Sequence, residues 1–139
     1  MDSILLVDDD PQSRGAAARL LRAEGYRVTE AANGEEALAA LKQQRPADLI
    51  LLDLDMPRID GLTFLGLLRA DPRFNAIPVV VTSGFADPDF RRRVERLWAD
   101  DYLVKCTFSG AELIQTVRKH LRHAAMEAAN YGSRAVAWS

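Results

Sequence analysis

The sequence predicts an α/β fold: a doubly wound parallel sheet of five strands flanked by five helices. Short apolar runs alternate with helix-forming segments at a spacing of roughly 25 residues, which is typical of strand–helix units in parallel sheets. The run over residues 49–52 is apolar throughout and ends on Asp53, as expected of a strand that is buried on both faces. No internal repeat or low-complexity linker interrupts this alternation.

In the first half of the chain, we predict strands over residues 3–7, 27–31 and 48–52, and helices over 11–24 and 34–44. Asp10 and Pro11 suit the N-cap and first helical position of the first helix, and Gly25 suits its end. The run over 27–31 alternates only weakly between apolar and polar residues, so we expect it to be an edge strand.

In the second half, we predict strands over residues 78–82 and 101–104, and helices over 62–70, 88–98 and from 110 onward. An aspartate–proline pair stops the helix that ends at residue 70, and a second such pair begins the helix at residue 88. Ser109 and Glu112 have the spacing of a capping box, which predicts the start of the last helix.

Length and composition indicate one folded domain. The chain has 139 residues, of which 48% are hydrophobic and 27% charged. The net charge of −2 favours neither a global nucleic-acid surface nor an anionic-membrane surface. No apolar stretch approaches the ~20 residues that span a bilayer, and no signal peptide is visible, so we expect a cytoplasmic protein. The single cysteine excludes an internal disulfide framework.

Polar residues stand at the predicted strand ends: Asp8, Asp9, Asp53, Thr82 and Lys105. The carboxyl ends of parallel strands meet at one edge of the sheet, where ligands bind in open α/β folds. Three carboxylates in one site repel one another and need raised pKa values or a divalent cation, and oxygen ligands suit Mg²⁺. An aspartate beside such a metal can attack phosphorus, while a lysine and a threonine share the phosphoryl charge.

These residues belong to motifs that resemble the receiver domain of bacterial two-component response regulators. The resemblance runs from Ile4 to about Leu121. It rests on Leu-Leu-Val-Asp-Asp-Asp-Pro at 5–11, Leu-Asp-Leu-Asp-Met-Pro-Arg-Ile-Asp-Gly at 52–61, Val-Val-Thr-Ser at 80–83 and Asp-Tyr-Leu-Val-Lys at 101–105. It implies a flavodoxin-like sheet with the strand order 2-1-3-4-5.

The resemblance also implies a phosphoacceptor and a metal site. Asp53 would be the phosphoacceptor and also a ligand of Mg²⁺ (or Mn²⁺). Asp8 and Asp9 would be the acidic pair, with Asp9 the direct metal ligand, and the backbone carbonyl of Asp55 would complete the protein's share of the metal shell. The side chain of Asp55 could equally be an inactive loop group.

Three further residues would carry the switch. By resemblance, Lys105 pairs with the phosphoryl group, Thr82 hydrogen-bonds to it, and Tyr102 turns inward on activation. The face formed by the fourth helix, fifth strand and fifth helix would then change its affinity for a downstream protein. The phosphoryl donor would be a sensor histidine kinase or a phosphotransfer protein. Thr82 could instead be an ordinary strand residue, and Tyr102 a half-buried tyrosine that does not switch.

Two positions depart from the family pattern. Cys106 follows Lys105 where proline and a cis bond are usual. A non-proline cis bond costs ~2.5–4 kcal/mol, so we predict a trans bond and a rearranged loop there. Trp98 stands where a small residue, often glycine, is usual, and should alter the partner face or stack on the fourth helix. The arginines at 91–93 are either a solvated helix face or a docking surface.

Three functions are therefore in competition. The first is a phosphorylation switch, which is not an enzyme beyond its own phosphorylation and slow dephosphorylation. The second is a receiver-like module that binds proteins without phosphate, which Cys106 favours. The third is a phosphohydrolase with an aspartate nucleophile, because Asp53 and Asp55 fit an Asp-x-Asp motif. Its haloacid-dehalogenase-like relatives carry that motif near the chain start, which counts against it.

The end of the chain lies beyond the resemblance. We assign residues 1–122 to the receiver domain and 123–139 to a helical extension and tail, with no output domain. High helix propensity extends the last helix, and Asn130 and Gly132 should end it. Trp138 then needs a surface to rest on, either the domain itself or a second copy in a homodimer. We expect no direct contact with nucleic acid or membrane.

Overall fold

The computed structural model describes residues 2–43, 47–56, 61–84, 87–105 and 108–138, with backbone alone for 130–138. The strands are β1 (Ser3–Val7), β2 (Arg27–Ala31), β3 (Leu49–Asp53), β4 (Val79–Ser83) and β5 (Asp101–Val104). The helices are α1 (Pro11–Ala23), α2 (Gly34–Gln43), α3 (Gly61–Ala70), α4 (Pro88–Arg96) and α5 (Gly110–Trp138). Among these described residues, no helix has both the length and the apolar character needed to cross a membrane.

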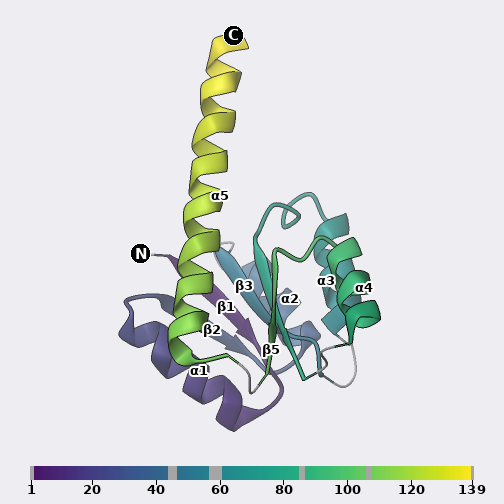
Figure 1. The fold of residues 1–139 in the computed structure, drawn as a ribbon. Helices are drawn as coiled ribbons and strands as arrows, with labels where there is room; N and C mark the ends of the chain where they lie inside the picture. Colours follow the sequence, from purple (N-terminus) through teal and green to yellow (C-terminus); the bar gives the residue numbers. More distant parts are fainter. Residues whose placement is uncertain (1, 44–46, 57–60, 85–86, 106–107, 139) are drawn as a thin grey trace.

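The strands form one parallel sheet in the order β2-β1-β3-β4-β5. This confirms the predicted fold class and strand order, and it places the weakly alternating strand β2 at an edge. Helices α1 and α5 cover one face of the sheet, and α2, α3 and α4 cover the other (Figure 1). Side chains alternate between the faces, so Leu49 and Leu51 of β3 join one core while Ile50 and Leu52 join the other.

Polar side chains begin the helices as predicted. Asp10, Asp87 and Ser109 each accept a hydrogen bond, at 3.1 Å, from a backbone amide two or three residues further on. A capping box that we did not predict begins α2. There Asn33 accepts from the amide of Glu36 at 2.8 Å, and the Glu36 carboxylate accepts from the amide of Ala32 at 2.7 Å.

Two predicted helix ends are wrong. Helix α4 ends at Arg96 instead of Trp98, because Leu97 caps it and Trp98 has the left-handed φ of 62°. Helix α5 does not end at Asn130 or Gly132 but continues to Trp138. A helical glycine costs only about 1 kcal/mol relative to alanine, so one glycine in an alanine-rich segment does not have to end a helix. The C-terminal half of α5 projects beyond the sheet (Figure 1).

Candidate functional site

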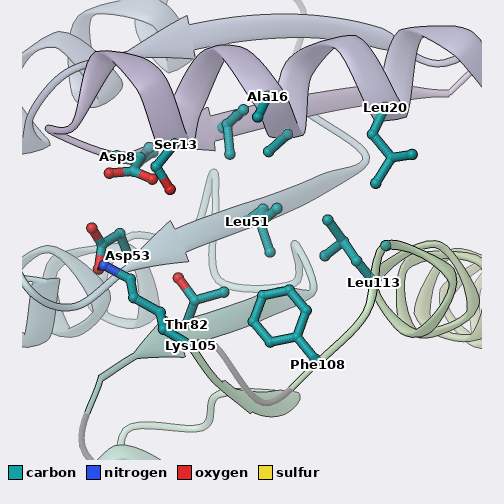
Figure 2. Close-up of a pocket in the computed structure, with 14 residues that line it drawn as sticks. Asp8, Ser13, Ala16, Leu20, Leu51, Asp53, Thr82, Lys105, Phe108 and Leu113 are labelled. Atoms are coloured by element: carbon teal, nitrogen blue, oxygen red, sulfur yellow. The ribbon is translucent and has the colours of Figure 1, made fainter.

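The predicted strand-end residues lie together at the carboxyl edge of the sheet. Asp8 directly follows β1, Asp53 ends β3, and Lys105 directly follows β5. Thr82 of β4 is the register partner of Asp53 on the neighbouring strand. Figure 2 shows the side chains of Asp8, Asp53, Thr82 and Lys105 around one pocket, with Lys105 reaching Asp53. Parallel strands bring these residues together across almost a hundred positions of sequence.

Asp53 is buried, with only 2% of its surface exposed. Its Oδ1 accepts hydrogen bonds from the backbone amide of Asp55 and from Nζ of Lys105, both at 2.9 Å. Its Oδ2 is buried and has no hydrogen-bond partner among the described residues. An unsatisfied buried carboxylate oxygen is costly, so this atom is suited to a ligand.

Three carboxylates form an acidic cluster that could hold a cation. One oxygen from each of Asp8, Asp9 and Asp53 lies within 4.8 Å of the others. Burial and, to a smaller extent, the neighbouring Asp53 carboxylate raise the pKa of Asp8 to about 6, against a partial lowering by the amide of Asp10. A divalent cation would relieve this repulsion and would find only oxygen ligands, which Mg²⁺ prefers. The residues therefore fit the predicted metal.

Lys105 is the cation that faces this cluster. Partial burial lowers the pKa of its ammonium group, but the hydrogen bond to Asp53 and the charges of the nearby aspartates more than offset this, so the pKa lies above its usual value. The ammonium group also lies 3.5 Å from Asp55. Lys105 therefore stays charged and can pair with a negatively charged group that enters the site.

The side chain of Asp55 contacts three neighbouring residues. Its carboxylate accepts from the Ser83 hydroxyl at 2.9 Å and from the Gly84 amide at 2.7 Å. These bonds tie the segment after β3 to the segment after β4, beside Lys105. Sequence reasoning missed Ser83 and Gly84, although a second hydroxyl directly after Thr82 was a visible signal.

Gly61 is required where α3 begins. A Cβ atom at this position would lie 2.6 Å from the Leu54 Cα atom and 3.0 Å from the Asp53 carbonyl oxygen. Backbone atoms cannot move aside as a flexible side chain can, so only glycine allows this close approach. The approach brings the first turn of α3 against the end of β3, next to the acidic cluster.

The pocket continues from the acidic cluster into an apolar hollow between α1 and the start of α5 (Figure 2). Its volume is about 230 Å³. Ala16 and Leu20 of α1, Leu51 of β3, and Phe108 and Leu113 line its apolar part. Ser13 lies beside Asp8 at its polar end and was not predicted from the sequence.

Tyr102 lies on β5 with 7% of its surface exposed, so it is buried rather than half-buried. Its ring packs edge-on against Phe90 of α4, with 6.5 Å between centroids. The Arg91 guanidinium lies 5.5 Å from the centre of the Tyr102 ring. Tyr102 thus joins β5 to α4. Cys106 lies outside the described residues, so the predicted trans bond after Lys105 remains a prediction.

The strand order and the acidic site define the class of protein: a flavodoxin-like α/β domain with a candidate cation site at the carboxyl edge of its sheet. Residues 4–118 match the family model described as "Response regulator receiver domain", and the chain therefore belongs to that family. Receiver domains are in general signalling switches rather than enzymes, and they bind Mg²⁺ at an acidic pocket. Their response-regulator relatives imply histidine kinases and downstream proteins as partners.

Curated relatives agree with this assignment. The chain is 40% identical over 114 residues to the gliding motility regulatory protein of Myxococcus xanthus, covering 82% of this chain and 14% of the relative. It is 41% identical over 119 residues to the transcriptional regulatory protein PrrA of Mycobacterium tuberculosis, covering 86% of this chain and 49% of the relative. The chain thus spans half or less of these relatives' length.

Solved structures show the same fold. The chemotaxis protein CheY4 of Vibrio cholerae has a TM-score of 0.79 at 29% identity, covering 86% of this chain and 98% of that one. A putative response regulator from Chloroflexus aurantiacus has a TM-score of 0.80 at 32% identity, covering 87% of this chain and 98% of that one.

Proposed function

We propose that this chain is a phosphorylation-dependent signalling switch. Asp53 accepts a phosphoryl group from a sensor histidine kinase or a phosphotransfer protein, with Mg²⁺ as cofactor. The observation that carries the proposal is the buried, unpartnered Oδ2 of Asp53, which lies in a three-carboxylate cluster with Lys105 on its other oxygen. The cation and Lys105 would balance the negative charge of a phosphoryl group on Asp53.

The transfer itself needs little from the protein besides position and charge. A carboxylate oxygen of Asp53 forms a bond to phosphorus while the bond from phosphorus to the donor's imidazole nitrogen breaks, and that nitrogen keeps the electron pair. Lys105 pairs with one phosphoryl oxygen, and the Thr82 hydroxyl donates to another. Asp8, Asp9, Asp53 and the carbonyl of Asp55 would hold Mg²⁺, which supplies positive charge against the phosphoryl oxygens.

The output is a change on the face formed by α4, β5 and α5. Phosphorylation adds up to two negative charges beside Lys105 at the end of β5. Tyr102, on the same strand, contacts Phe90 and Arg91 of α4. A shift of Lys105 and Thr82 toward the phosphoryl group would therefore reach α4 through β5, and would bias this face toward one of two packings.

The remaining expectations belong to the same proposal. The chain acts in the cytoplasm on a downstream protein, without direct contact with nucleic acid or membrane. Residues 1–122 form the receiver domain, and residues 123–139 extend its last helix. A homodimer through that extension is one form that the output could take.

The experiment uses beryllofluoride, a phosphoryl analogue, with Mg²⁺. We expect a saturable, Mg²⁺-dependent change in tryptophan fluorescence, with no response from Asp53→Asn. Light scattering on the same samples tests for a dimer. If fluorescence and mass are both unchanged, intact-mass spectrometry after incubation with acetyl phosphate decides the matter. Absence of the acyl phosphate there would refute the proposal and favour the phosphate-independent binding module.

One structural observation disfavours the phosphohydrolase. In that alternative, Asp55 would serve as a general acid beside the Asp53 nucleophile. Both oxygens of its carboxylate instead already have partners: they accept hydrogen bonds from Ser83 and Gly84, and one lies near the Lys105 ammonium group. A general acid would have to reach the leaving group with one of these oxygens.

A further inference from the structure

Trp98 combines two features that folding alone does not explain. It is the only non-glycine residue with a positive φ, at 62°, in the described part of the chain. Its side chain is also 76% exposed, more than that of any other large hydrophobic residue described. A bulky residue in this conformation is a true outlier, and exposure of the indole returns little hydrophobic stabilisation. Strain of this kind persists mainly at functional sites.

The backbone around Trp98 is held firmly in place. Arg69 of α3 donates to the Trp98 carbonyl from Nε at 3.0 Å and from Nη2 at 2.8 Å. The same guanidinium donates to the Ile77 carbonyl at 2.8 Å. The Trp98 amide donates to the Glu95 carbonyl at 2.9 Å. The exposed indole is therefore carried by an ordered backbone, which lowers the entropy that a partner would have to remove on binding.

The surface beside Trp98 has the charge needed to select a partner. A hollow of about 420 Å³ is lined by Trp98 and three side chains of α4: Arg92, Glu95 and Arg96. Glu95 is paired with Arg91 at 3.3 Å, and Arg92 with Asp89 at 3.1 Å. Arg96 has no ion-pair partner among the described residues. Helix α4 as a whole carries four arginines and two acidic residues, so the α4 side of the indole is net positive. A second hollow beside Trp98 is lined by Glu95, Asp100 and Glu127 with Arg69, so the positive charge is confined to the α4 side.

We propose that this hollow binds an acidic segment of a partner protein. An apolar side chain of the segment would pack against the Trp98 indole, and its carboxylates would pair with Arg96 and Arg92. Tryptophan and arginine are the residues most enriched at binding hot spots. A protein fits better than nucleic acid, because Glu95 lines the hollow and the chain's net charge is −2.

This site includes α4, part of the output face of the proposed switch, so the inference rests on the proposed function for its role and names a class of partner for that face. Trp98 precedes β5, which begins at Asp101, so it lies at the amino edge of the sheet. Asp53 ends β3 and lies at the carboxyl edge. The partner segment therefore needs no contact with the phosphoacceptor, and its binding can be measured with the phosphoacceptor removed.

The probe is a random-peptide display library selected on the full chain. We expect enrichment of peptides that combine glutamate or aspartate with a large apolar residue. A selected peptide, made with a fluorophore, then gives affinities by fluorescence anisotropy. Binding should weaken at high salt, because carboxylate–arginine pairs at an exposed site are screened.

Variants at position 98 separate the indole from the strain. Trp98→Ala removes the indole but keeps a side chain at positive φ, and Trp98→Gly removes both; each should weaken binding about tenfold or more. Trp98→Phe keeps an aromatic ring and should retain most of the affinity. Leu67→Ala is the matched control, since Leu67 is 45% exposed on α3, and it should bind as the parent chain does.

Charge variants test the second half of the site. Arg96→Glu should weaken binding and reduce its salt dependence. Arg19→Glu, on the exposed surface of α1, changes the net charge equally and should have no effect. Asp53→Asn should bind the peptide normally, so failure of this proposal and failure of the phosphorylation switch give different results.

Three results would overturn the proposal: no enrichment of acidic peptides, equal binding by Trp98→Ala, or equal loss in Leu67→Ala. A doubled mass in light scattering that Trp98→Ala abolishes would also overturn it, because a second copy would then occupy the hollow.

Discussion

The two edges of the sheet both carry residues that cost folding free energy, but the kind of cost differs. At the carboxyl edge the cost is electrostatic: Asp8 and Asp53 are buried side by side, and an oxygen of Asp53 has no partner among the described residues. At the amino edge it is steric and apolar: Trp98 combines a positive φ with an exposed indole. The first suits a cation and a phosphoryl group, and the second suits a protein contact. The kind of destabilisation thus indicates the kind of ligand.

The largest effect should come from removing the lysine at the carboxyl edge. Lys105→Met should slow formation of the Asp53 acyl phosphate from acetyl phosphate about a hundredfold, because a charged donor to the phosphoryl oxygens is lost. Intact-mass spectrometry over time gives the rate. Trp98→Gly is the control from the other edge and should be phosphorylated at the parent rate. An unchanged rate in Lys105→Met would remove Lys105 from the proposed chemistry.

The next effect concerns packing at the same edge. Gly61→Ala should destabilise the chain by about 2–3 kcal/mol, because the new methyl group meets the Leu54 backbone at 2.6 Å. Urea unfolding measures the change. Gly66→Ala on the same helix has no atom within 4 Å of its new Cβ and should be neutral or slightly stabilising. Equal effects from both variants would show that the close approach does not matter.

Asp8→Asn should stabilise the metal-free chain while abolishing Mg²⁺ binding. The pKa of Asp8 is raised to about 6 from 3.8, so protonation favours the fold, and this stabilisation is lost as the pH rises through 6. At pH 7 the variant should gain about 1 kcal/mol, after allowing for solvent screening. Thermal unfolding with and without Mg²⁺ measures both effects. If Asp8→Asn is instead less stable than the parent chain without metal, the buried charge of Asp8 does not destabilise the fold.

At the amino edge, Trp98→Gly should stabilise the chain by about 0.5–1 kcal/mol. A left-handed backbone conformation costs a residue with a side chain about 1–2 kcal/mol, which glycine does not pay. The greater conformational freedom of glycine in the unfolded chain cancels part of this gain. Trp98→Ala retains the strain and should change stability little. If alanine stabilises as much as glycine does, the cost lies in the exposed indole and not in the backbone.

The smallest effect on stability should come from removing the extension. Residues 125–129 of α5 are exposed, so this part of the tail buries little surface on its own domain. Truncation after His123 should lower the free energy of unfolding by less than about 0.5 kcal/mol. Light scattering of both forms tests the predicted homodimer, since a dimer built through the extension would become monomeric. A large loss of stability would show that the extension packs on the domain after all.

The sequence predicted the sheet and its acidic edge because both follow from local patterns. Apolar runs located the strands, and parallel connections then required Asp8, Asp53 and Lys105 to meet. Boundaries were less certain: β3 and β4 each begin and end one residue later than predicted. This shift does not change the predicted place of Asp53, which lies at the end of the strand or directly after it in either case.

Other features could not be predicted, because they depend on how distant segments approach each other. The bonds from Ser83 and Gly84 to Asp55 join the end of β4 to the segment after β3, which is far away in sequence. The close contact of Gly61 depends on the path of the chain after β3. The positive φ of Trp98 contradicts the preference of its residue type, and local propensity therefore predicts the opposite.

Arg69 has a consequence for how this domain can diversify. It binds the carbonyl of Trp98, a group that every amino acid has, and two further carbonyls, of Asn75 and Ile77. The hydrogen bonds that hold the loop before β5 therefore do not depend on the side chain at position 98. Substitutions there can change what the surface recognises while the fold and the acidic site are inherited intact, so a new interaction could evolve in a single mutational step.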